Sequence, residues 1–265
     1  MGRLKSIDRL MLLIYAVLII FGVGSAYFGY KLPGYITGLT TMFGFTFVFL
    51  HSFKQLGLVK TILLVSLTFV VSMIFEAVGV ATGIVYGPYH YTLTLGPKFL
   101  GLVPYLIALA WFMMAYPSFV IAVTIIPPHW SKAWWKLGVA ATGGVIMTAW
   151  DMAMDPMMVA GGHWVWEIDG AYFGVPLQNF WGWWLTIFVT IFLFMYVSNF
   201  VPNDLIDKDI KFNFLAVTGY AITGLSSVLL DLRIGLQGAG LAGFFAMLPW
   251  VMIGLITISR NSAET

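Results

Sequence analysis

Residues 61–80 read TILLVSLTFVVSMIFEAVGV and contain a single charged side chain, that of Glu76. A bilayer is crossed by about 20 apolar residues in an α-helix, so this run is long enough to span one. It does not alternate between polar and apolar residues with a period of two, which argues against a barrel strand. Because lipid satisfies no backbone hydrogen bonds, the run predicts a transmembrane helix.

Seven further apolar runs extend this prediction along the chain. Of the 265 residues, 60% are hydrophobic and 9% are charged, whereas a soluble domain has about 25% charged residues. We therefore predict an all-α, polytopic bundle of about eight transmembrane helices, forming a single integral domain over residues 1–265 in the cell membrane. The other seven runs are Leu10–Phe28, Pro33–Phe53, Gly101–Ile126, Trp134–Trp150, Phe180–Phe200, Phe214–Leu230 and Leu236–Ile258.

The positive charges predict the orientation of the helices. If the eight runs alternate in direction, all but three of the 13 Lys and Arg fall on one side. The exceptions are Lys31, Lys98 and Arg233. Since cytoplasmic loops are enriched in Lys and Arg, both termini are predicted to be cytoplasmic. The net charge of +2 is small and scattered, which argues against a nucleic-acid partner, and the absence of Cys excludes thiolate chemistry.

The loop from Pro156 to Asn179 carries no Lys or Arg and has a turn signal. In residues 163–168, HWVWEI, Trp occupies alternate positions, and Asp169-Gly170 separates this run from Ala171-Tyr172-Phe173. Asp-Gly between such runs is a strong signal for a tight hairpin. We predict a small aromatic hairpin capping the outer end of the bundle, with an irregular interfacial loop as the alternative.

Acidic residues are the candidates for chemistry. Six of the 11 fall in or near the outer half of the predicted bundle: Glu76, Asp151, Asp155, Glu167, Asp169 and Asp231. A carboxyl group inside a membrane is costly and is by default a functional candidate. Burial favours its protonated form, which can act as an acid. We take Glu76, Asp151, Asp155 and Asp231 as catalytic candidates, and expect Glu167 and Asp169 on the surface.

The same residues also fit structural roles. Asp151 and Asp155 share a helix face only if the helix continues past Trp150. Asp155 precedes Pro156 and would instead cap a following helix. In their structural roles, Asp231 forms a local ion pair with Arg233, and Glu76 forms hydrogen bonds to neighbouring helices.

The four histidines predict no metal site. His51 and His129 are expected at the cytoplasmic interface, and His90 and His163 on the outer side, without the spacing of metal ligands. The pair Asp151-x-x-x-Asp155 is similar to the aspartate motifs of magnesium-dependent membrane prenyltransferases, but the second motif of those enzymes is missing.

Five ordered motifs carry a resemblance to a known family. They are FEAVGVATG at 75–83, YGPYHYT at 86–92, LGPK at 95–98, AWDMAMDP at 149–156 and GAYFGVPLQNFWGW at 170–183. The chain resembles the membrane carotenoid hydratases of bacteria and archaea, and looks most like their archaeal branch, the bisanhydrobacterioruberin hydratases. This resemblance implies addition of water to terminal C=C bonds of an acyclic carotenoid, by a hydro-lyase that needs no cofactor. It also implies carotenoid, membrane lipid and other carotenoid biosynthesis enzymes as partners.

Alkene hydration sets requirements for the site. An acid protonates the less substituted carbon, and water captures the tertiary cation. We expect Asp151 or Glu76 to be the acid and Asp155 or Asp231 to orient the water. The predicted substrate contacts are Tyr86, Tyr89, His90, Trp150, Tyr172, Phe173, Asn179 and Trp183. Two alternatives remain: a carotenoid- or lipid-binding membrane protein or transporter without catalysis, and a magnesium-dependent membrane prenyltransferase.

Overall fold

The computed structural model describes residues 4–127, 129, 131–201 and 210–263. Within them lie eight helices that are long and apolar enough to cross a membrane, which confirms the predicted fold class. The helices are α1 (Leu4–Phe28), α2 (Tyr35–Leu56), α3 (Leu58–Thr82), α4 (Tyr105–Ile125), α5 (Lys132–Ala160), α6 (Leu177–Val197), α7 (Asn213–Ile234) and α8 (Gln237–Ala263).

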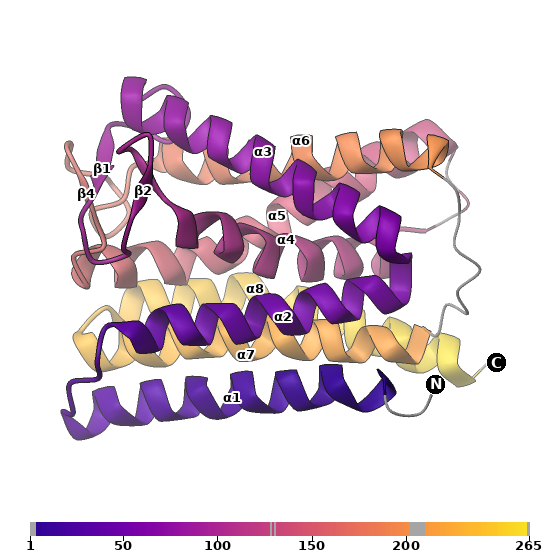
Figure 1. Ribbon diagram of the computed structural model, residues 1–265, viewed down its shortest axis with the longest axis horizontal. Coiled ribbons are helices and arrows are strands. Elements are labelled where there is room, and N and C mark those ends of the chain that lie inside the picture. Colours follow the sequence, from indigo (N-terminus) through magenta and orange to yellow (C-terminus); the bar gives the residue numbers. More distant parts are fainter. Residues whose placement is uncertain (1–3, 128, 130, 202–209, 264–265) are drawn as a thin grey trace.

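Helices α4 and α5 form the centre of the bundle. They bury the largest share of their apolar spans, whereas α1 and α8 bury the smallest. Helix α5 packs against α4, α6, α7 and α8, and α1 lies on the outside against α2 and α7 (Figure 1). The residues of the central helices are therefore shielded by protein on most sides, which is where polar groups in a membrane bundle are found.

Helix α5 continues well beyond the predicted end at Trp150. It runs through Asp155 and Pro156 to Ala160. The proposed capping role of Asp155 is therefore wrong, because the helix does not restart there. A proline inside a membrane helix is tolerated when neighbouring groups satisfy the freed backbone carbonyl. The continuation places Asp151 and Asp155 on one face, as their spacing of four residues requires.

Two short two-stranded sheets lie at one end of the bundle, called here the strand end (Figure 1). Strand β1 (Tyr89–Tyr91) pairs antiparallel with β4 (Trp164–Trp166), and β2 (Lys98–Phe99) pairs with β3 (Val103–Pro104). The first pair joins the α3–α4 loop to the α5–α6 loop.

The predicted hairpin at Asp169-Gly170 is wrong. Its first arm pairs with β1 rather than with residues 171–173, which instead form a tight turn closed by a Tyr172–Val175 bridge. The local turn signal is overridden because pairing with β1 buries aromatic rings of both loops.

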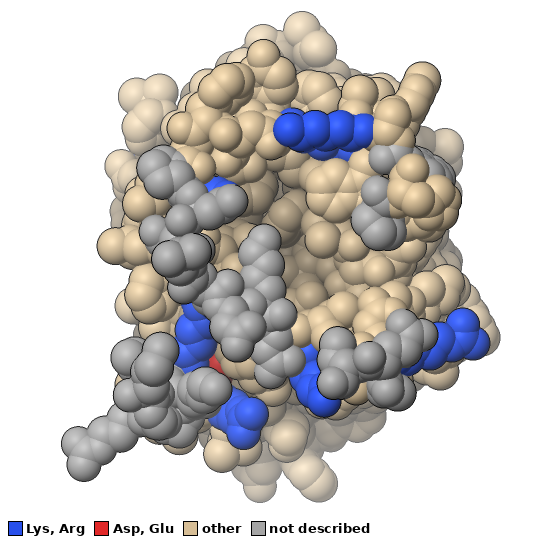
Figure 2. Space-filling model, turned by 90° about the vertical axis from the view of Figure 1, so that its right-hand side faces the viewer, with Lys and Arg blue, Asp and Glu red and all other residues tan. Residues whose placement is uncertain are grey.

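The opposite end of the bundle holds the start of α1 and the end of α8 (Figure 1). Figure 2 shows several Lys and Arg side chains around this end and, among the residues that the structure describes, little acidic surface. Of the basic residues, Lys54 lies in the last turn of α2 and Lys132 begins α5. The clustering of positive charge at this end agrees with the uneven distribution in the sequence, and the cytoplasmic placement of the termini stays a prediction.

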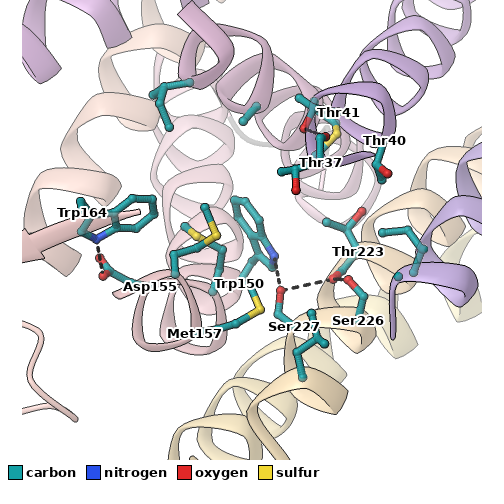
Figure 3. A pocket seen from close by; sticks show the side chains of 18 of the residues that line it. Thr37, Thr40, Thr41, Trp150, Asp155, Met157, Trp164, Thr223, Ser226 and Ser227 are labelled. Atoms are coloured by element: carbon teal, nitrogen blue, oxygen red, sulfur yellow. Dashed lines mark hydrogen bonds between the residues drawn. The ribbon is translucent and has the colours of Figure 1, made fainter. Parts of the chain in front are cut away.

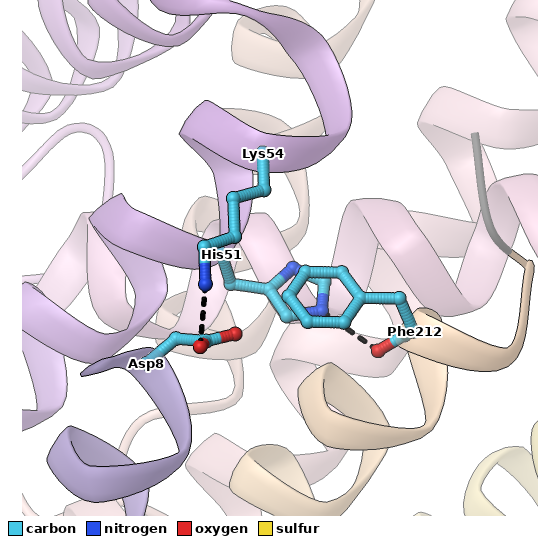
Figure 4. A network of polar contacts seen from close by, with 4 residues as sticks. All are labelled: Asp8, His51, Lys54 and Phe212. Atoms are coloured by element: carbon cyan, nitrogen blue, oxygen red, sulfur yellow. Dashed lines mark hydrogen bonds and ion pairs between the residues drawn. The ribbon is translucent and has the colours of Figure 1, made fainter. Parts of the chain in front are cut away.

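A polar network ties α1, α2, α4 and the segment at Phe212 together at this end, and Figure 4 shows the part formed by Asp8, His51, Lys54 and Phe212. Lys54 forms an ion pair with Asp8 of α1. His51 was expected at the membrane interface but is fully buried. Its Nε2 donates to the carbonyl of Phe212 at 2.9 Å, its Nδ1 accepts from the hydroxyl of Tyr116 at 2.8 Å, and its ring stacks on that of Phe212. These contacts satisfy both ring nitrogens, so burial of His51 is structurally supported.

Candidate active site

The pairing of β1 with β4 presents four aromatic side chains to the interior. Tyr89 lies opposite Trp166, and Tyr91 lies opposite Trp164, with ring centroids 4.9 and 5.7 Å apart. Because side chains alternate between the two faces of a strand, His90 points outward and is exposed. The pair therefore supplies two phenol hydroxyls and two indole N–H groups to the interior of the bundle.

Glu76 of α3 receives the donors of β1. It is 2% exposed, and its Oε2 accepts hydrogen bonds from the hydroxyls of Tyr89 and Tyr91. Its Oε1 accepts from the indole Nε1 of Trp111 in α4, at 2.9 Å. Burial and then the charge of Glu76 raise the pKa of Tyr89 and of Tyr91 well above the ordinary value, so both keep a proton to donate. Three donors around one carboxyl group are suited to its ionised form.

Asp155 of α5 receives the donors of β4. It is 1% exposed, and its Oδ1 accepts from the indole Nε1 of Trp164 at 2.9 Å and of Trp166 at 3.3 Å. Its Oδ2 accepts from the side-chain amide of Asn179 at 2.7 Å. The same amide donates to Oδ2 of Asp151 at 2.8 Å. Two negative charges held this close and away from water repel each other, so the pair is suited to sharing one proton.

A cavity of about 450 Å³ joins these two acidic sites. Glu76, Asp155 and Asn179 line it, and Trp111 stacks on Trp183 in its wall with ring centroids 4.2 Å apart. Among the described residues that line it there is no Lys or Arg. Such a wall suits an apolar ligand better than an anionic one. Aromatic faces also attract a cation that forms beside them. The lining rings are those of Tyr15, Tyr30, Tyr86, Tyr89, Tyr91, Trp111, Trp150, Trp164, Trp166 and Trp183.

Comparison with known proteins identifies the family. The sequence profile of the family described as "Carotenoid biosynthesis protein" matches residues 36–249, which include both acidic sites but not α1, whose side chains line another part of the cavity. The chain belongs to the carotenoid biosynthesis protein family. Among relatives of this family member, the bisanhydrobacterioruberin hydratase of Haloarcula japonica is 33% identical over 119 residues. That match covers 45% of this chain and 39% of the relative, well under half of the relative's length. No solved structure matches the chain.

This carotenoid biosynthesis family member is a multi-pass membrane protein with a role in the carotenoid pathway. The structure brings seven of its predicted site residues to the cavity: Glu76, Asp155, Tyr86, Tyr89, Trp150, Asn179 and Trp183. It places five outside the cavity: Asp151, Asp231, His90, Tyr172 and Phe173.

The five outlying residues have other surroundings. Asp151 reaches the cavity only through Asn179, and His90 pairs with Glu167 on the surface at 3.3 Å. Tyr172 donates to the carbonyl of Met152 at 2.9 Å, and burial raises the pKa of its hydroxyl to about 12. The ring of Phe173 packs on α8, where a Cβ on Gly238 would come within 2.5 Å of it.

Asp231 of α7 lies at the interface with α8. It is fully buried, and neither of its side-chain oxygens has a hydrogen-bond partner among the described residues. A Cβ on Gly240 of α8 would lie 3.0 Å from that of Asp231, which shows how closely the helices approach. The predicted local partner, Arg233, instead donates to the carbonyl of Ala26 at 3.2 Å.

Four cavity residues that hold the acids were missing from the predicted site: Tyr91, Trp111, Trp164 and Trp166. The alternating pattern of residues 89–91 and 164–166 carried a signal for three of them, because it places rings on one face of each strand. Trp111 lies in a continuous apolar run, where periodicity selects no residue. In the described part of the chain, no three His, Asp or Glu side chains group closely enough to hold a metal ion.

Proposed function

We propose that this protein hydrates terminal C=C bonds of an acyclic carotenoid of the bacterioruberin type. The observation that supports this most directly is that Glu76 and Asp155 line the same aromatic cavity. Each of them accepts hydrogen bonds from its own set of side chains. Hydration of an unactivated alkene needs a proton donor, a base and a shielded apolar slot. The two acids supply the donor and the base, and the aromatic lining of the cavity supplies the slot.

In the proposed reaction, the acid is the pair of Asp151 and Asp155. The two share a proton, and Asp155 transfers it because it is the member that lines the cavity. The proton bonds to the less substituted alkene carbon and leaves a tertiary cation. The indole groups of Trp164 and Trp166 and the amide of Asn179 stabilise the carboxylate that remains.

Glu76 is the proposed base. Water attacks the cation and forms the C–O bond, and Glu76 accepts the proton that the new oxonium group releases. The rings of Trp111 and Trp183 border the region where the cation forms and stabilise it through their faces. Because Glu76 and Asp155 face the same cavity, the proton returns between them and restores the starting state.

The two alternatives receive less support. A prenyltransferase binds a diphosphate, and the cavity lining offers no Lys or Arg among its described residues. A binding protein or transporter without catalysis has no need for two acids with separate donor shells on one apolar cavity.

Expression in a host that makes the acyclic precursor tests the proposal. Mass analysis of the pigments should reveal addition of water with the wild-type protein. Glu76→Gln and Asp155→Asn should each lower product about 100-fold or more, as is typical for loss of a general acid or base.

Matched controls are available in the α5–α6 loop. Glu167→Gln and Asp169→Asn change exposed acids of the same types outside the cavity, and should leave product formation at the wild-type level. Wild-type product levels from Glu76→Gln and Asp155→Asn would contradict the proposed mechanism. Pigment that co-purifies unmodified with the wild-type protein would favour the binding or transport function.

A further inference from the structure

The cavity has a second end of different chemistry. Three hydroxyl side chains of α2 and three of α7 line it, at matching spacings of three and four residues along each helix. They are Thr37, Thr40, Thr41, Thr223, Ser226 and Ser227. Figure 3 shows this hydroxyl end on the far side of Trp150 from Asp155 and Trp164. One cavity therefore joins an acidic end and a hydroxyl end.

The hydroxyls at this end are mainly hydrogen-bond acceptors toward the cavity. Thr40 and Thr41 donate to carbonyls of their own helix at 2.9 and 3.0 Å, and Thr223 and Ser226 do the same at 2.8 and 2.7 Å. A hydroxyl has one proton, so each of these oxygens retains only acceptor capacity. The hydroxyl end is thus suited to a small molecule that donates hydrogen bonds.

Two further side chains donate hydrogen bonds to hydroxyls of this end. The hydroxyl of Tyr15 lies 2.6 Å from that of Thr223, and donates to it because the proton of Thr223 goes to Gly219. The indole Nε1 of Trp150 lies 3.3 Å from the hydroxyl of Ser227. These contacts fix the orientations of the hydroxyl oxygens. Water is held in proteins by about two to four polar partners. Six hydroxyl side chains line this end of the cavity, so it offers enough partners for a water molecule.

We propose that the hydroxyl end holds and delivers the water that captures the carbocation, an inference that rests on the proposed hydratase function. At the acidic end, the lining rings of Trp164 and Tyr91 are buried, and Asp155 is 1% exposed. The hydroxyl end instead continues to the α1–α2 loop, where Tyr30 lines the same cavity and is 72% exposed. Water therefore enters beside α2 and reaches the acids from within the cavity.

The cation has two fates, and their ratio reports on water delivery. Capture by water forms a C–O bond and releases one proton, giving the alcohol. Without capture, the cation loses a proton from a neighbouring carbon to Glu76 and returns to an alkene. In D2O the acid delivers deuterium, so the second fate labels the recovered alkene. Loss of water delivery raises the ratio of labelled alkene to alcohol, whereas loss of the acid lowers both products.

The experiment compares two double variants in D2O with an acyclic carotenoid as the substrate. Thr40→Val with Ser226→Ala removes one cavity hydroxyl from each helix while nearly preserving side-chain shape. Thr46→Val with Thr218→Val is the matched control, because both hydroxyls donate to their own helices and neither lines the cavity. The cavity variant should raise the ratio of labelled alkene to alcohol about tenfold, as expected for loss of roughly one hydrogen bond to the captured water.

The outcomes separate the two proposals. An unchanged ratio, or a parallel fall of both products, overturns water delivery by the hydroxyl end and leaves the hydratase function standing. Absence of both alcohol and label with the wild-type protein overturns the hydratase function and, with it, the water-delivery proposal. Thr40→Val alone gives the same readout should the double variant fail to fold.

Discussion

Replacing Asn179 by Leu should strongly destabilise the protein, because one amide bridges two buried acids. Asn179 is 2% exposed, Asp151 is fully buried and Asp155 is 1% exposed, so bulk solvent does not replace the lost bonds. If the pair shares a proton, one acceptor is neutral and the other is charged. The average membrane-buried side-chain bond contributes about 0.6 kcal/mol, and a bond to a charged group contributes about 1.5–3 kcal/mol. The expected loss is therefore about 2–3.5 kcal/mol.

The assay is unfolding of the detergent-solubilised protein, followed by circular dichroism, with the free energy of unfolding as the readout. Asn199→Leu is the matched control, in the 3₁₀ turn that directly follows α6. Asn199 is exposed, and its amide donates to the carbonyls of Met195 and Tyr196. The control should change the free energy of unfolding by no more than about 0.5 kcal/mol, as surface substitutions usually do. A loss below about 1 kcal/mol for Asn179→Leu would refute the bridging role.

Two further predictions concern the cavity wall and the strand end. Gly22 of α1 lines the cavity with nothing within 4 Å of an added Cβ, so Gly22→Leu should place its side chain in the substrate space and lower product formation severalfold. Gly24→Leu also meets no neighbour but does not line the cavity, so equal loss in both variants would argue against a substrate role for this wall. Burial lowers the pKa of His163, whose Nδ1 lies 2.8 Å from the hydroxyl of Thr94. The unfolded chain then binds the proton more readily, so stability is fully present above about pH 6.5 and falls as the pH drops below it. His163→Gln should flatten that part of the curve of thermal midpoint against pH; an unchanged slope would rule out His163 as its source.

The fold class was predictable because hydropathy alone selects the spans. Each run had to supply its own backbone hydrogen bonds, so residues 61–80 already predicted a helix. The shared face of Asp151 and Asp155 was also predictable, since it depends only on helical period once the helix continues.

Local sequence patterns could not predict which segments distant in the sequence pair with one another. Nothing local to Trp164 or Trp166 indicates that their strand pairs with Tyr89–Tyr91, and the adjacent Asp169-Gly170 signal favoured the wrong partner. The burial of His51 depends on Tyr116 and the Phe212 carbonyl, which are distant in sequence.

The hydroxyl end could not be predicted from the sequence for a different reason. Thr and Ser that bond back to their own helix are tolerated in membrane spans, so they carry no sequence signal of a cavity.

The pairing of β1 with β4 has a consequence for how sequences of this kind can diverge. Side chains alternate along a strand, so inserting or deleting one residue within either strand would turn its rings to the opposite face. A change in β1 would strip Glu76 of two donors, and a change in β4 would strip Asp155 of two. Evolution can therefore vary the ring types at Tyr89 or Trp166 more freely than it can vary the lengths of these two strands.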